Sequence, residues 1–284
     1  MIGALIVVFR EVFEAGLILG IVLAVTRDVA GRSYWVSGGV AAGVCGAAIV
    51  AVFANSLSEA FAGAGQELFT ATILGVAVVM LAWHNIWMAR HGRQLAADMR
   101  HEGEAVASGA KPVAALALVV AVAVLREGFE VVLFLYAMIM QEGGANAGIA
   151  IGGGLGLILG ALVCVLTYFG LLQIPSRHLF AATSFMIAFL AAGMASQAMA
   201  FLAQANVLTA LDKVVWDTSW ILSDESILGR ALRTLIGYTA QPTEMQIIVY
   251  LGTLTAIFAL MRIFAPPPSG ARAPVRTDLA SQRK

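Results

Sequence analysis

Apolar stretches long enough to cross a lipid bilayer dominate this sequence. A transmembrane helix needs about 20 mostly apolar residues, because each residue advances the helix by about 1.5 Å through a hydrocarbon layer of about 30 Å. Seven stretches reach that length, near residues 2–25, 35–55, 67–89, 113–140, 147–172, 178–205 and 245–264. The chain is therefore predicted to be an all-α integral membrane protein with seven transmembrane helices.

The composition supports this class of protein. Hydrophobic residues make up 60% of the 284 residues and charged residues only 12%, whereas soluble domains carry about 25% charged residues. The formal net charge is zero, so no nucleic-acid partner is predicted, and the expected surroundings are membrane lipid. Cys45 and Cys164 lie in apolar stretches and are interpreted as small packing side chains. No prosthetic group is predicted.

Lysine and arginine are concentrated in alternate connections. The connections after the first, third and fifth stretches, together with the tail after the seventh, hold twelve of these residues, and the other three connections hold three. Because cytoplasmic loops are enriched in lysine and arginine, the N-terminus is predicted to lie outside and the C-terminus in the cytoplasm. The predicted location is the inner (cytoplasmic) membrane. Residues 265–284, which begin with a proline run, are expected to form a disordered cytoplasmic tail.

Two of the apolar stretches contain the same charged motif. The first stretch contains "REVFE" from Arg10 to Glu14, and the fourth contains "REGFE" from Arg126 to Glu130. Successive residues of a helix are about 100° apart, so the arginine and both glutamates of each motif share one face. A charge at the membrane centre costs about 2.5 to 3.5 kcal/mol, so both motifs are predicted to point into the bundle.

The duplicated motif predicts an internal repeat. Residues 1–110 and 111–205 would each hold three helices, and because three is odd, the second repeat would be inserted upside down relative to the first. Inverted repeats are common in secondary transporters, whose binding sites lie at the repeat interface near the middle of the membrane. Residues 206–244 would form an outer loop before the last helix at 245–264, so that 1–264 forms a single permease domain.

The charges of the two motifs suggest a bound cation. Four glutamates and two arginines leave a surplus of two negative charges if all are ionised. Ion pairs alone could lock the two helices together, but a buried surplus of negative charge requires a cation or protons. Carboxylate oxygens suit magnesium, calcium, manganese or oxidised iron. The predicted metal ligands are Glu11, Glu14, Glu127 and Glu130, with Arg10 and Arg126 organising the site.

The paired R-E-x-x-E motifs resemble those of the high-affinity iron permeases, the oxidase-dependent iron transporters of fungi and bacteria. The resemblance covers about residues 1–264 and includes the segment from Trp216 to Tyr238, which is similar to the acidic outer loop before that family's last helix. Val12 and Phe13 stand where the family commonly has glycine and leucine. The resemblance implies import of iron, as Fe²⁺ or Fe³⁺, through the motif glutamates, with an extracytoplasmic oxidase or iron-delivery protein as partner.

Two other functions remain as alternatives. A transporter of another divalent cation, or an exporter, would share the architecture. A membrane-embedded metalloenzyme such as a di-iron oxidase is disfavoured, because that chemistry combines carboxylates with histidine at Glu-x-x-His spacing, which the sequence lacks. No enzymatic activity is predicted, and the number of copies that assemble is left open.

Weaker signals lie outside the motifs. Glycines recur every four residues from Gly144 to Gly160 and are predicted to be helix-packing contacts. A helix is predicted from about Ser223 to Gly237, at the membrane interface. His84, beside Asn85 toward the cytoplasmic end of its stretch, either helps the ion to leave or belongs to a satisfied polar pair. Gln197 is a second candidate for the path. Outer-loop residues predicted to gather cations are Glu59, Glu67, Asp217, Asp224 and Glu225.

Overall fold

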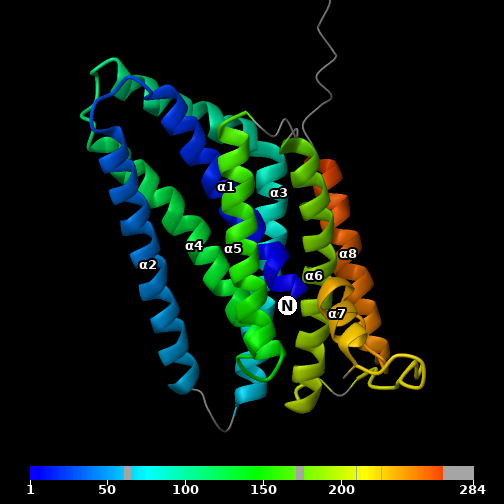
Figure 1. Ribbon diagram of the computed structural model, residues 1–284. Coiled ribbons are helices and arrows are strands. Elements are labelled where there is room, and N and C mark those ends of the chain that lie inside the picture. Colours follow the sequence, from blue (N-terminus) through cyan, green and yellow to red (C-terminus); the bar gives the residue numbers. More distant parts are fainter. Residues whose placement is uncertain (61–64, 171–175, 209, 225, 265–284) are drawn as a thin grey trace, which may run out of the picture.

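The computed structural model is all-helical over the residues it describes, 1–60, 65–170, 176–208, 210–224 and 226–264. Within these ranges the chain forms eight helices and no strand (Figure 1). The all-α prediction is confirmed, and the predicted tail, 265–284, lies outside the described residues. The helices are α1 (Ile2–Val25), α2 (Arg32–Ala60), α3 (Gln66–Ala107), α4 (Ala115–Gln141), α5 (Ala147–Tyr168), α6 (Ser176–Gln204), α7 (Ile227–Ile236) and α8 (Glu244–Ile263).

Five helices are both long and apolar enough to cross a membrane. These five spans are Arg32–Ala54, Gln66–Met88, Ala147–Tyr168, Ala181–Gln204 and Glu244–Ile263. Helices α1 and α4 are comparably long, with 24 and 27 residues, but each contains an arginine and two glutamates. Helix α7 has only 10 residues, which is too short to span a bilayer. Five of the seven predicted stretches are therefore candidate spans on length and hydropathy, and the two that carry the charged motifs are helical as predicted.

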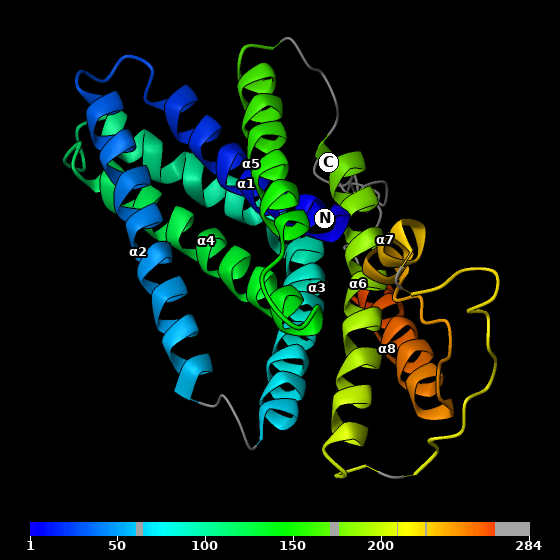
Figure 2. The same ribbon diagram turned by 60° about the horizontal axis from the view of Figure 1, so that its bottom comes forward.

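The helix ends lie alternately at the two ends of the bundle. The turn between α1 and α2, the turn between α3 and α4, and the C-terminal end of α8 lie at one end, at the top of Figure 1. The turn between α4 and α5 and the C-terminal end of α6 lie at the other. The second part of α3 leans away from the first and runs toward the turn between α1 and α2, as both views show (Figure 2).

Two of the main helix pairs, α1 with α5 and α2 with α4, pack closely through glycines. The main packing partners are α1 with α5, α2 with α4, and α3 with α6. A Cβ atom on Gly156 of α5 would lie 2.5 Å from the carbonyl oxygen of Leu5 in α1, and one on Gly39 of α2 would lie 2.6 Å from that of Ala117 in α4. The glycine spacing therefore marks packing contacts, as predicted. Gly144 is an exception, because it precedes α5 and has a φ of 146°.

Two apolar clusters lie on either side of the charged motifs along α1 and α4. One gathers Val7 of α1 and Phe134 of α4 with residues of α3, α5, α6 and α8. The other gathers Val22 of α1 and Val120 of α4 with residues of α2 and α3. The motif residues lie between these clusters in both helices, and an apolar-lined cavity of about 750 Å³ between α1, α2, α4 and α5 reaches Glu11 and Glu127.

The short helix α7 was predicted in the right place but with the wrong start. The side chain of Ser226, not Ser223, caps it by accepting from the backbone N–H of Gly229 at 2.9 Å. The helix ends as predicted at Gly237, whose φ of 70° belongs to the left-handed region that glycine tolerates. Gly237 packs directly against Gly193 of α6, where a Cβ on Gly193 would lie 2.6 Å from the Gly237 Cα.

The contact between α1 and α5 predicts that Gly156→Ala destabilises the protein. The new methyl group would meet backbone atoms of Leu5 and Phe9, which cannot rotate away, and overpacking of this kind costs about 1 to 3 kcal/mol. Gly154→Ala is the matched control in the same helix, because nothing lies within 4 Å of its Cβ position. We expect a lower melting temperature of the detergent-solubilised protein for Gly156→Ala alone. Equal melting temperatures for the two variants would contradict this account of the contact.

Candidate metal site

The motif of α1 is fully buried and internally paired. Arg10 Nε lies 2.9 Å from Glu14 Oε1, and Arg10 Nη1 lies 3.6 Å from Glu11 Oε1. None of the three side chains is more than 2% exposed. Because arginine and glutamate at positions i and i+4 are neighbours on a helix surface, α1 itself brings this pair together. The prediction that this motif points into the bundle is confirmed.

The motif of α4 is arranged differently. Glu127 and Glu130 are buried, but the Arg126 side chain is 38% exposed and its Nε is 3.9 and 3.7 Å from their Oε1 atoms. The Arg126 guanidinium carbon lies 4.5 Å from the ring centroid of Trp87 in α3, an attractive cation–π geometry. The expectation that both arginines are buried alike is therefore wrong for Arg126, because Trp87 provides a favourable position at the edge of the cluster.

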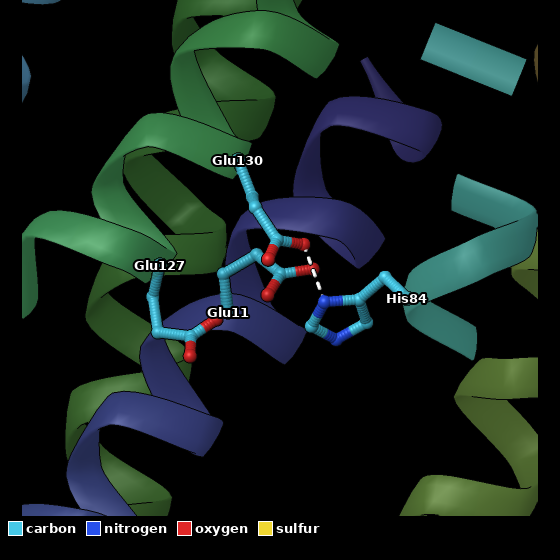
Figure 3. A group of neighbouring side chains, drawn as sticks. All are labelled: Glu11, His84, Glu127 and Glu130. Carbon is cyan, nitrogen blue, oxygen red and sulfur yellow. Dashed lines mark ion pairs between the residues drawn. The ribbon is translucent and has the colours of Figure 1, made fainter. Parts of the chain in front are cut away.

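His84 of α3 connects the two motifs. Its Nδ1 lies 2.5 Å from Glu130 Oε2 of α4, and its Nε2 lies 3.2 Å from Glu14 Oε2 of α1. The imidazole is 3% exposed, and Figure 3 shows it reaching from α3 toward the carboxylates of the other two helices. Asn85 is not its partner, since the Asn85 amide donates to the Ser184 carbonyl oxygen at 3.0 Å. The interpretation of His84 and Asn85 as a satisfied pair is therefore wrong, whereas a role of His84 along the path of the ion remains a prediction.

Four side chains from three helices form a group with the dimensions of a metal site. Glu11, His84, Glu127 and Glu130 each offer a donor atom, and the four atoms lie within 4.8 Å of one another (Figure 3). Metal–ligand distances of about 2.1 Å would place donors on opposite sides of an ion about 4.2 Å apart. The group is therefore slightly wider than a closed coordination shell and could contract around one cation.

Unpaired oxygens in the cluster also favour a cation. Both carboxylate oxygens of Glu11, and one oxygen each of Glu14, Glu127 and Glu130, have no hydrogen-bond partner within the described part of the chain. Buried polar atoms without partners are costly, and carboxylate oxygens most of all when ionised. A cation held between α1 and α4 would supply the missing interactions.

Gln197 lies outside this group. It is buried in α6, where its Oε1 accepts from Arg233 Nη2 at 3.0 Å and its Nε2 donates to Thr239 Oγ1 at 3.4 Å. Both ends of the amide are therefore used to hold the segment around α7 against α6. Its suggested role in lining the path remains a prediction.

The outer acidic residues fall into three groups. Asp217 accepts from Ser219 and from Gln241, and Asp224 accepts from the backbone N–H of Ala240, so both lie beside the same short segment. The hydrogen bonds from Ser219 hold the pKa of exposed Asp217 below its usual value, which keeps it ionised. Glu67 is exposed in the first turn of α3. The side chains of the other two predicted residues, Glu59 and Glu225, lie outside the described part of the chain.

Comparison with known proteins identifies the family. The sequence matches the iron permease FTR1 family over residues 1–267. The chain belongs to the iron permease FTR1 family. It is similar to the ferrous iron permease EfeU of Yersinia pestis, with 33% identity over 273 residues that cover 94% of both chains. It is also similar to the ferrous iron permease EfeU of Escherichia coli O6:H1, with 30% identity over 273 residues that cover 94% of this chain and 97% of the relative.

No solved structure matches the chain. Membership of the iron permease family confirms the resemblance expected from the two motifs, and the apolar helices agree with a multi-pass membrane protein that transports iron. The buried acidic cluster lies within the matched region.

The unequal arginines of the permease lead to a prediction about stability. Arg10→Gln would leave buried Glu11 and Glu14 without their cation, and breaking a buried pair in this way costs about 3 to 5 kcal/mol. Arg126→Gln removes a half-exposed contact worth about 1 kcal/mol. We therefore expect Arg10→Gln to lower the melting temperature and the yield of monodisperse protein far more than Arg126→Gln. Equal losses would show that the two arginines are equivalent after all.

Proposed function

We propose that this protein imports ferrous iron across the cytoplasmic membrane through a site built from the glutamates of its two R-E-x-x-E motifs. The observation that carries the proposal is the cluster of buried carboxylates shared between α1 and α4, whose unpaired oxygens need a cation. Family membership supports iron as the substrate, and the similarity to ferrous iron permeases supports the ferrous state. The proposed site residues are Glu11, Glu14, Glu127 and Glu130, organised by Arg10 and Arg126.

Helix packing supports two inverted repeats, α1 to α3 and α4 to α6. A twofold relation between them would pair α1 with α4, α2 with α5, and α3 with α6. The contact of α1 with α5 then corresponds to the contact of α4 with α2, and both are among the main contacts of the bundle. The glycines of α5 and α2 serve the same purpose in these two contacts. In this architecture the helices α1 to α6, including the charged α1 and α4, are six membrane spans, and α8 is the seventh span.

The direction of transport follows from the distribution of charge. The ends of α1 and α3 and the tail after α8 are rich in lysine and arginine, which favours the cytoplasm for this side. The opposite end carries Asp217 and Asp224, which are well placed to concentrate cations before entry. An extracytoplasmic oxidase or iron-delivery protein would present iron at this end.

Transport requires that the site bind iron and then release it. Apolar clusters lie on both sides of the motifs along α1 and α4, so the charged residues are bordered by apolar packing in both directions along these helices. Glu11 and Glu14 belong to the first repeat and Glu127 and Glu130 to the second. Rocking of the repeats around the site would open it to each side in turn. Four glutamates, two arginines and Fe²⁺ sum to zero charge, which limits the electrostatic cost of carrying the ion.

Replacement of each motif glutamate by glutamine tests the site. Glu11→Gln, Glu14→Gln, Glu127→Gln and Glu130→Gln keep the side-chain volume but remove one negative charge. Losing one charged partner at a buried site costs several kcal/mol, so we expect uptake of radioactive Fe²⁺ by whole cells to fall about tenfold or more. Glu104→Gln, which changes an exposed glutamate late in α3, is the matched control and should transport normally.

The same assay separates iron import from the alternatives. Near-normal uptake in all four variants would overturn the assignment of the site. Proteoliposomes that carry Mn²⁺ or Ca²⁺ and ignore Fe²⁺ would indicate another divalent cation as the substrate. Iron that leaves loaded cells faster when the protein is present would indicate an exporter.

The proposed orientation predicts which loops can be labelled from outside. In a variant with both native cysteines replaced by alanine, Asp212→Cys follows α6 and Ser108→Cys lies in the turn after α3, and both positions are exposed. A membrane-impermeant maleimide added to intact spheroplasts should label the cysteine at 212 and leave the one at 108 unlabelled until the membrane is permeabilised. Labelling in the opposite order would reverse the orientation.

A further inference from the structure

We propose that His84 is itself a ligand of the transported iron, through Nδ1, and that Glu14 holds this imidazole in place instead of binding the metal. This inference rests on the proposed function and assigns different roles to the glutamates of the α1 motif. The ligand set would then be Glu11, Glu127, Glu130 and His84, drawn from three helices.

The surroundings of the two α1 glutamates separate their roles. Glu14 is the more closely paired of the two, because Arg10 Nε lies 2.9 Å from its Oε1 and His84 Nε2 lies 3.2 Å from its Oε2, although Oε2 makes no hydrogen bond within the described residues. Neither oxygen of Glu11 has a hydrogen-bond partner among the described residues. Glu11 belongs to the four-membered group of donor atoms, whereas Glu14 does not. Glu11, whose Oε1 lies 3.6 Å from Arg10 Nη1, is therefore held less closely by protein cations than Glu14 and is the better placed of the two to bind a metal ion.

The contacts of His84 determine which ring nitrogen can bind iron. A neutral imidazole has one N–H donor and one lone pair, on different nitrogens. When Nε2 donates to Glu14, the lone pair is on Nδ1, which lies 2.5 Å from Glu130 Oε2 but makes no hydrogen bond with it or with any other described residue. Two electron-rich atoms this close need a proton or a metal cation to join them. Iron bound by both Nδ1 and Glu130 would meet that need.

The successive contacts of Arg10 with Glu14 and of Glu14 with His84 resemble those that commonly orient a metal-binding histidine. Metal-binding histidines commonly donate their second N–H to a carboxylate, which fixes both the tautomer and the orientation of the ring. Arg10 in turn fixes the Glu14 carboxylate. With Arg10 balancing Glu14, the charges of Fe²⁺ and Arg126 balance the three ligating carboxylates.

An imidazole nitrogen in the shell has a consequence for selectivity. Carboxylate, carbonyl and water ligands suit magnesium, calcium and manganese, whereas imidazole favours iron and the later transition metals. His84 would therefore discriminate ferrous iron from the more abundant hard cations. A site of carboxylates alone would lack this preference.

X-ray absorption at the iron edge tests the ligand directly. The full-length permease, purified in detergent without oxygen, would be loaded with one equivalent of Fe²⁺. Imidazole bound to iron gives a characteristic scattering pattern from the ring carbons, which carboxylates do not give. We expect this pattern in the wild-type protein, its loss in His84→Gln, and its retention in His91→Gln, which changes another histidine of α3.

A second variant leaves His84 untouched, so the test does not depend on the folding of His84→Gln. The chain has four histidines, His84, His91, His101 and His178, and a variant with the last three replaced by glutamine should keep the imidazole pattern.

Glu14→Gln should also keep the imidazole pattern while weakening Fe²⁺ binding by about 10- to 100-fold, the usual effect of losing a carboxylate that orients a metal ligand. In uptake assays, His84→Gln should become more sensitive to inhibition by Mn²⁺ and Ca²⁺.

The possible outcomes separate this inference from the proposed function. Iron bound in wild-type protein with oxygen ligands only, or an imidazole pattern that survives His84→Gln, would overturn the role of His84 and leave iron import standing. Loss of the pattern in the triple variant would do the same. A wild-type permease that neither binds nor transports Fe²⁺ would instead overturn the proposed function, and this inference with it.

Discussion

The arrangement of this bundle depends on the cost of placing charge where lipid surrounds the helices. Arg10, Glu11 and Glu14 cannot face hydrocarbon, so α1 must turn them inward, and α4 must do the same with Glu127 and Glu130. Charges that share a buried space must then compensate one another, which Arg10 does through its 2.9 Å contact with Glu14. The contact between α1 and α4 is thus an electrostatic requirement, and the apolar clusters on either side reinforce it by packing the two helices into the bundle.

Glycine makes this arrangement sterically feasible. Helix α5 packs against α1 through Gly156 and Gly160, and α2 packs against α4 through Gly39 and Gly43, in each case with backbone close to backbone. Each charged helix therefore packs against a second helix, α1 against α5 and α4 against α2, through glycine-rich apolar faces.

Much of the site could be predicted because the cost of exposing charge to lipid restricts which way a charged helix face can point. The spacing of each motif determines a shared helix face, and its apolar surroundings dictate that the face points inward. The position of Arg126 could not be predicted in this way, since it depends on Trp87, 39 positions earlier in the sequence. The central place of His84 was missed for the same reason, although a histidine within an apolar span was itself a signal of function. The start of α7 was misplaced by a few residues because Ser223 and Ser226 are both good caps.

Under the proposed function, the division of the carboxylates between α1 and α4 would let one site both capture and release a cation. Glu11 is on one helix and Glu127 and Glu130 on the other, so affinity depends on how far apart the two helices lie. When they are close, an ion meets ligands on several sides. When they separate, each helix retains only part of the set, and Arg10 remains beside Glu11 at 3.6 Å to compete for its carboxylate. A site formed within one rigid helix could bind iron as tightly, but it would have no comparable means of letting the ion go.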